Sequence, residues 1–177
     1  MNNKQEKPLS ERERYTKGGR FLPALCTLLG TLMLVGVIAA LVPVTVPRFM
    51  GYEVLEVLTG SMEPEIPIGS IVYAKDTPPE DIAEGDVIAF TSDGSIVVHR
   101  VVTNQTLAGY FVTKGDANEL EDMNEVYYSA VLGRVDKHLP MLGRVYSVYT
   151  SSRGKIYLLI IALCGGLLSI LGARLRD

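Results

Sequence analysis

The stretch "VIAFTSDGSIVVHRVV", residues 87–102, has two apolar runs on either side of Asp93-Gly94. Asp-Gly between such runs is the strongest short-range signal for a β-hairpin with a two-residue turn. Counting outward from that turn sets Ile88 opposite His99. Because side chains alternate along a strand, His99 shares a face with the valines two positions before and after it. The stretch therefore predicts a hairpin that carries a histidine among apolar neighbours.

The rest of the central segment also predicts β structure, because short apolar runs are separated by Gly, Pro, Asp and Asn clusters. The strand-length runs are "GSIVYAK" (69–75), "DVIAF" (86–90), "SIVVHRVV" (95–102), "GYFVTK" (109–114) and "SAVLGRV" (129–135). The polar stretch at 75–86 is interpreted as a loop, and the segment shows no sustained helical period. We therefore expect a mainly β protein with a compact, sheet-like or barrel-like domain.

Two uncharged segments flank this domain. Residues 21–47 exceed the ~30 Å of a bilayer core at about 1.5 Å per helical residue. A cleavable signal peptide is the alternative, but its apolar region is shorter, about 7 to 15 residues. Residues 156–173 form a second, shorter candidate span. The predicted order is a basic cytoplasmic segment (1–20), a transmembrane helix (21–47), an extracytoplasmic β domain (48–155), a second transmembrane helix (156–173) and a cytoplasmic tail (174–177).

Positive charges indicate the orientation in the membrane. Lysines and arginines are frequent in residues 1–20, and Arg174 and Arg176 follow the second apolar segment. By the positive-inside rule, both termini are expected in the cytoplasm and the β domain on the outer face. The sequence thus predicts a multi-pass protein of the plasma membrane.

Composition excludes several other classes of protein. The net charge of −3 provides no basic field, so we expect no binding to nucleic acid. Cys26 and Cys164 both fall within the apolar segments, which argues against a disulfide framework or a cysteine zinc site. The acids at 116–122 do not have the spacing of a calcium-binding EF-hand loop. No metal and no cofactor is expected.

Three residue types needed for nucleophilic hydrolysis occur in order along the chain. Ser61 lies in "TGSMEP" (59–64) soon after the first apolar segment, His99 lies on a predicted strand, and acids follow in "TKGDANELED" (113–122). Serine, histidine and aspartate form the triad of many hydrolases, in various chain orders. Each also has a structural interpretation, as a turn serine, a buried strand histidine or a solvated acidic loop. The other histidine, His138, lies in no motif and is interpreted as structural.

Four motifs together are more specific than any of them alone. They are "SMEP" (61–64), "GDVIAF" (85–90), "VVHRVV" (97–102) and "TKGDAN" (113–118) with an aspartate at 122. In this order after an N-terminal apolar segment, the sequence resembles the type I signal peptidases. It is most similar to the branch shared by the endoplasmic-reticulum enzyme, archaea and some Gram-positive bacteria. The matched stretch covers residues 54–135, and the other large branch has a lysine at the position of His99.

The resemblance implies a role for each matched residue. Ser61 would attack the scissile carbonyl, and His99 would take its proton and return it to the leaving amine. Asp116 and Asp122 match two acidic positions of the branch, and either could orient the imidazole; we favour Asp122. The backbone N–H of Ser61 and the hydroxyl of Thr59 are candidate oxyanion donors, although Thr59 also fits a plain strand-end residue.

The resemblance also implies the function. We expect a membrane-bound serine endopeptidase that cleaves signal peptides from exported proteins after small residues. Its partners would be signal-peptide-bearing preproteins and the lipid bilayer, and the sequence does not specify accessory subunits. The second span favours a prokaryotic member of the family. The alternative is a non-catalytic, membrane-anchored assembly or binding protein on the same scaffold.

Overall fold

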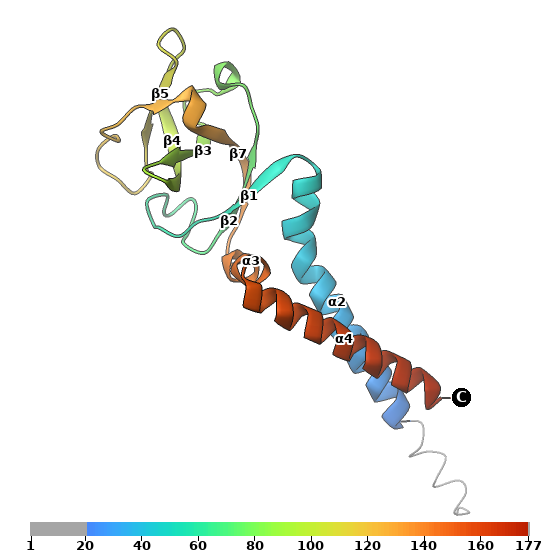
Figure 1. The fold of residues 1–177 in the computed structure, drawn as a ribbon. Coiled ribbons are helices and arrows are strands. Elements are labelled where there is room, and N and C mark those ends of the chain that lie inside the picture. The colour runs from blue at the N-terminus through green and yellow to red at the C-terminus, as the bar shows by residue number, and fades with distance from the viewer. Residues whose placement is uncertain (1–20, 177) are drawn as a thin grey trace, which may run out of the picture. The chain divides into compact units, whose positions relative to one another are not determined.

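The computed structural model describes residues 21–176 and is drawn in Figure 1. It divides into two compact units, with the boundaries at Ala39/Ala40 and Gly154/Lys155. The first unit contains most of two long helices, and the second contains the β domain. The basic segment that we predict at residues 1–20, and the last residue of the predicted tail, lie outside the described residues.

The two long helices are α2 (Phe21–Phe49) and α4 (Ser152–Arg174). Both are long and apolar enough to cross a membrane, judged by length and composition, and little of their surface is buried inside the protein. Inside the first unit they approach through glycines, because a Cβ at Gly30 would lie 2.5 Å from the carbonyl oxygen of Gly165. Close approach through small residues is common where membrane helices pack.

The β domain is built on one antiparallel sheet with the strand order β1-β2-β7-β3-β4-β5-β6. Its strands are β1 (Tyr52–Glu56), β2 (Ile71–Lys75), β3 (Val87–Ser92), β4 (Ser95–Gln105), β5 (Tyr110–Lys114), β6 (Val126–Tyr127) and β7 (Val131–Leu139). Short 3-10 turns, η1 (Pro79–Asp81) and η2 (Tyr128–Ala130), and the helix α3 (Gly143–Thr150) complete the domain. The prediction of a mainly β protein with two apolar helices is confirmed.

The predicted hairpin is present with the predicted register. Strands β3 and β4 pair so that Ile88 lies opposite His99, and Ser92 and Ser95 close the two-residue turn. The turn residues Asp93 and Gly94 have φ values of 49° and 75°. Positive φ at both positions is what a turn matching the strand twist requires, so this local sequence sets the register of the histidine.

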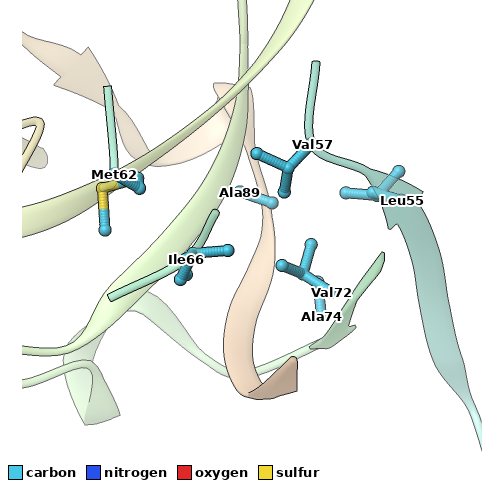
Figure 2. Packing of buried hydrophobic residues seen from close by; sticks show 7 residues of the cluster. All are labelled: Leu55, Val57, Met62, Ile66, Val72, Ala74 and Ala89. Atoms are coloured by element: carbon cyan, nitrogen blue, oxygen red, sulfur yellow. The ribbon is translucent and has the colours of Figure 1, made fainter. Parts of the chain in front are cut away.

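Both faces of the sheet bury apolar side chains, and the two larger clusters contact β4. The first cluster, shown in Figure 2, consists of Leu55, Val57, Met62, Ile66, Val72, Ala74 and Ala89. The second consists of Ile82, Ile88, Phe90, Val101, Phe111 and Val126. Val98 packs against the first cluster and Val97 against the second, so β4 contributes to both.

Some parts of the β domain differ from the sequence-based prediction. The sequence shows no sustained helical period in residues 48–155, and the structure adds one short helix there, α3, which has eight residues. A helix of about two turns is too short to give a clear hydrophobic period in the sequence. Its Tyr146 packs on a third buried cluster, which consists of Val54, Ile71 and Tyr73. The predicted loop at 75–86 contains the turn η1 and buries Ile82, which is 1% exposed.

Candidate active site

Ser61 lies in a tight turn between β1 and β2. The N–H of Glu63 donates a hydrogen bond to the carbonyl of Gly60 (3.0 Å), and the N–H of Ile66 donates to that of Met62 (2.8 Å). Met62 is 1% exposed and belongs to the first core cluster, whereas Ser61 is half-buried. The side chain of Met62 therefore packs in the core of the β domain. The buried methionine thus fixes the turn next to the serine.

His99 is held from one side by a carboxylate. Its Nδ1 lies 2.6 Å from Oδ2 of Asp122, and the hydroxyl of Thr113 donates to the same oxygen at 2.6 Å. His99 is 8% exposed and Thr113 is fully buried, so these bonds are largely screened from water. An ionised carboxylate only accepts hydrogen bonds, so the proton in this bond belongs to Nδ1. Nε2 is then the basic nitrogen of the neutral ring.

Asp116 has a different partner. Its carboxylate accepts two hydrogen bonds from Arg100, 2.8 Å from Nε and 2.6 Å from Nη2. The Nη1 of Arg100 also donates to the carbonyl of Gly85 at 2.8 Å. The hydrogen bond to Asp116 raises the pKa of the Arg100 guanidinium. The two acids that sequence could not separate thus contact neighbouring residues of β4, Asp122 contacting His99 and Asp116 contacting Arg100.

The loop at residues 115–118 brings the serine turn and the histidine together. The N–H of Ala117 donates a 2.9 Å hydrogen bond to the carbonyl of Ser61. A Cβ at Gly115 would lie 2.6 Å from that carbonyl oxygen and 3.1 Å from Nε2 of His99. The serine backbone and the basic nitrogen therefore flank the same point, and glycine leaves the space between them free.

Ser61 and His99 open into one cleft of about 820 Å³. Its walls are residues 55–59 and 95–99, and Met62, Asn118 and Tyr146 also line it. The exposed Thr59 lies in the same wall, two residues before the serine. Asp122 lines a separate cavity that also reaches His99. The imidazole thus lies between the serine cleft and the carboxylate.

Several residues of this site have no role that the sequence alone indicates. Gly115 and Asn118 fall inside a quoted motif, but their place beside Ser61 and His99 depends on how the loop folds. Tyr146 comes from α3, which no sequence signal indicated. His138 is half-buried on β7 and lies outside the cleft. Within residues 21–176, no group of three or more His, Cys, Asp or Glu residues could hold a metal ion.

Comparison with known proteins supports the resemblance seen in the motifs. No family model matches the chain. Signal peptidase I W of Bacillus subtilis (strain 168) is 42% identical over 80 residues, which cover 43% of this chain and 42% of the relative. The signal peptidase complex catalytic subunit SEC11C of Homo sapiens, like that of Mus musculus, is 32% identical over 104 residues, covering 52% of this chain and 54% of the relative.

The chain therefore spans about half the length of the curated relatives it matches. Both kinds of relative are named as signal peptidases or as the catalytic subunit of a signal peptidase complex. The similarity to type I signal peptidases that the motifs predicted is thereby confirmed. These relatives and the two apolar helices also indicate a membrane protein.

Proposed function

We propose that this protein is a membrane-bound signal peptidase, a serine endopeptidase that removes signal peptides from exported proteins by a Ser-His-Asp mechanism. One observation carries the proposal. Ser61 and His99 open into the same cleft, and the far side of the imidazole is held by Asp122. A cleft with a nucleophile, a base and a carboxylate that orients the base is the arrangement of acyl-transfer hydrolases.

The proposed mechanism gives Ser61, His99 and Asp122 the usual roles of a catalytic triad, and it is supported by the hydrogen bond between His99 and Asp122. The hydroxyl of Ser61 attacks the scissile carbonyl while Nε2 of His99 takes its proton, and the imidazolium that forms is stabilised by Asp122. The same proton then goes to the leaving amine, and a water molecule activated by His99 hydrolyses the acyl-enzyme. The N–H of Ser61 and the hydroxyl of Thr59 are the proposed donors to the oxyanion.

In this proposal Asp116 positions the site and does not take part in proton transfer. Its ion pair with Arg100 fixes the residue next to Gly115, and Gly115 lies against Ser61 and His99. The pair therefore holds the loop in the place where it supports the serine turn. Loss of the pair would act on the reaction through geometry.

The cleft suits an extended peptide. Strand β4 pairs with β3 from Ser95 to Arg100, but β5 pairs with β4 only from Arg100 onward. The second edge of residues 95–99 is thus left unpaired within the sheet, and residues 55–59 face it across the cleft. A substrate strand added here would be held by backbone hydrogen bonds. Its side chains over Val57, Met62 and Val98 would have to be small, because the core already fills that floor.

The apolar helices fit the proposed substrate. We propose that they span the plasma membrane at about residues 21–47 and 156–173, with both termini cytoplasmic and the β domain on the outer face. A signal peptide has an apolar segment that enters the bilayer. Confining enzyme and substrate to one membrane raises their effective concentration. Preproteins and lipid are therefore the proposed partners.

The test is to compare secreted and membrane proteins in cells with the wild-type protein, without it, and with Ser61→Ala. We expect signal peptides to be retained in the second and third cases and removed in the first. Normal processing in all three would favour the alternative, a non-catalytic assembly or binding protein. If cells without the protein fail to process signal peptides and cells with Ser61→Ala process them normally, catalysis by Ser61 is also excluded.

A further inference from the structure

Glu56 places a carboxylate in the proposed substrate cleft. It is the last residue of β1, and it lines the same cleft as Ser61 and His99. The other ionisable side chains that line this cleft are His99 and the phenol of Tyr146. The proposed mechanism gives Glu56 no role in proton transfer.

Alternation along the strand shows which side of a bound peptide would meet this carboxylate. Leu55 and Val57 are 8% and 6% exposed and belong to the first core cluster. Glu56 and Leu58 point to the opposite face, and Leu58 is 75% exposed. A peptide strand lying in the same sheet alternates in the same way. Its side chains thus contact the core floor at every second position and the face of Glu56 at the positions between.

The carboxylate of Glu56 is close to α3. A Cβ at Gly143, the first residue of α3, would lie 2.8 Å from Oε1 of Glu56, so a side chain there would displace it. No hydrogen bond or ion pair of the Glu56 side chain occurs among residues 21–176. Partial burial raises the pKa of this carboxyl group. Among the residues that the structure describes, no bond to the carboxylate accounts for its position in the cleft.

We propose that Glu56 selects substrates that carry a lysine or arginine at one position near the scissile bond, in alternation with the small side chains. This inference rests on the proposed function. Thr59, beside the serine, follows Glu56 by three positions, which is a reach of about 10 Å if this part of the chain is extended. That reach corresponds to a substrate residue a few positions from the cleaved bond. A basic side chain there would form a charge-assisted hydrogen bond to the carboxylate.

The experiment uses the full-length protein in detergent or liposomes and peptides of one parent sequence. A single lysine is moved through the positions on both sides of the scissile bond, with glutamine and glutamate at the same positions for comparison. We expect one position at which kcat/KM follows the order Lys, Gln, Glu, with roughly a fivefold step between Lys and Gln, as for a partly exposed ion pair. Glu56→Gln should abolish the step, and Glu56→Lys should reverse the order.

Glu53→Gln is the matched control, because Glu53 lies on the same strand, is exposed and does not line the cleft. It should keep the wild-type order. Equal cleavage of all peptides by the wild-type protein would overturn the inference and leave the proposed function standing. So would a lysine preference that survives in Glu56→Gln. Failure to cleave any peptide and any full-length preprotein would instead overturn the proposed function, and this inference with it.

Discussion

Arg100 and Asp116 form a two-point ion pair next to the candidate catalytic groups. Arg100 follows His99 on β4, and Asp116 follows Gly115 in the loop that contacts the serine turn. The pair therefore joins the strand that carries the proposed base to the loop that contacts the turn of the proposed nucleophile. Asp122 makes a separate bond to His99, the proposed base. The carboxylates of Asp116 and Asp122 thus have different partners, and substitutions can separate the effects of the two contacts.

Asp122→Asn should lower kcat by about four orders of magnitude while the protein stays folded, because an amide can hold the imidazole in the wrong tautomer. Asp116→Asn should mainly lower the thermal stability of the β domain, since it leaves Arg100 without its charged partner. Measuring kcat and Tm for both variants checks this assignment. A wild-type kcat for Asp122→Asn would reduce the proposed triad to a dyad.

Ser61→Ala should abolish cleavage and leave the melting temperature nearly unchanged. The turn is fixed by backbone hydrogen bonds and by buried Met62, so the hydroxyl contributes little to folding. Ser129→Ala, at an exposed position outside the cleft, is the matched control and should cleave normally. Cleavage by Ser61→Ala at the wild-type rate would show that this serine is not the nucleophile.

Gly115→Ala should inactivate the protein with little effect on membrane insertion. The added methyl group would lie 2.6 Å from the carbonyl oxygen of Ser61 and 3.1 Å from Nε2 of His99, so the turn or the ring must move. A displacement of about 1 Å in a catalytic group can cost roughly a hundredfold in rate. Gly36→Ala is the control, because a Cβ at that position would meet no atom within 4 Å apart from its chain neighbours and the backbone of its own helix. Equal kcat/KM for the two variants would contradict the proposed geometry.

His99→Lys should be nearly inactive at pH 7, although the resemblance to type I signal peptidases implies a lysine at this position in the other branch. A lysine works as a base only when its pKa falls several units below about 10.4, which needs an apolar site. Here Asp122 lies 2.6 Å from the ring nitrogen, and an opposite charge so near would keep the ammonium protonated. The double substitution His99→Lys with Asp122→Asn should regain some activity at high pH. Fast cleavage by the single variant at neutral pH would show that Asp122 does not contact residue 99.

Glu56→Gln should raise the Tm slightly at pH 7 and not at pH 4. Burial raises the pKa of Glu56 in the folded protein above its unfolded value, so the folded state binds the proton more tightly. The stabilisation that comes from this tighter proton binding is therefore present below the unfolded pKa. It is lost as the pH rises through the folded pKa. Gln resembles the protonated form at every pH. The Tm difference from wild type at the two pH values checks the sign, with Glu53→Gln as the control.

Local sequence signals were enough for most of the fold. Asp93-Gly94 set both the turn and the pairing of Ile88 with His99, because this turn type allows few registers. The strand order could not be obtained in this way, since β7 is inserted between β2 and β3 by contacts between distant residues. Helix α3 was missed for a similar reason, because its place depends on packing with β1 and β2.

The candidate site was predictable in its residue types and less so in its pairings. Motif order indicated Ser61, His99, Asp116 and Asp122 as candidates. Nothing in the sequence showed that Asp116 would contact Arg100. That choice depends on the fold of residues 115–122, where the N–H of Asp122 bonds to the carbonyl of Thr113 and turns its side chain towards His99. The cleft residue Glu56 was missed because a lone glutamate on a strand carries no signal of its own.

The unpaired edge of β4 bears on how many different substrates one such protein could process. Peptide groups are the same in every chain, so a strand held mainly by its backbone is recognised almost independently of its sequence. Only the few side chains that touch the floor or Glu56 would be subject to selection. Affinity and discrimination would therefore come from different parts of the same cleft. A substitution at Glu56 could change which preproteins are cleaved first, whereas one at the edge of β4 would slow the cleavage of all of them alike.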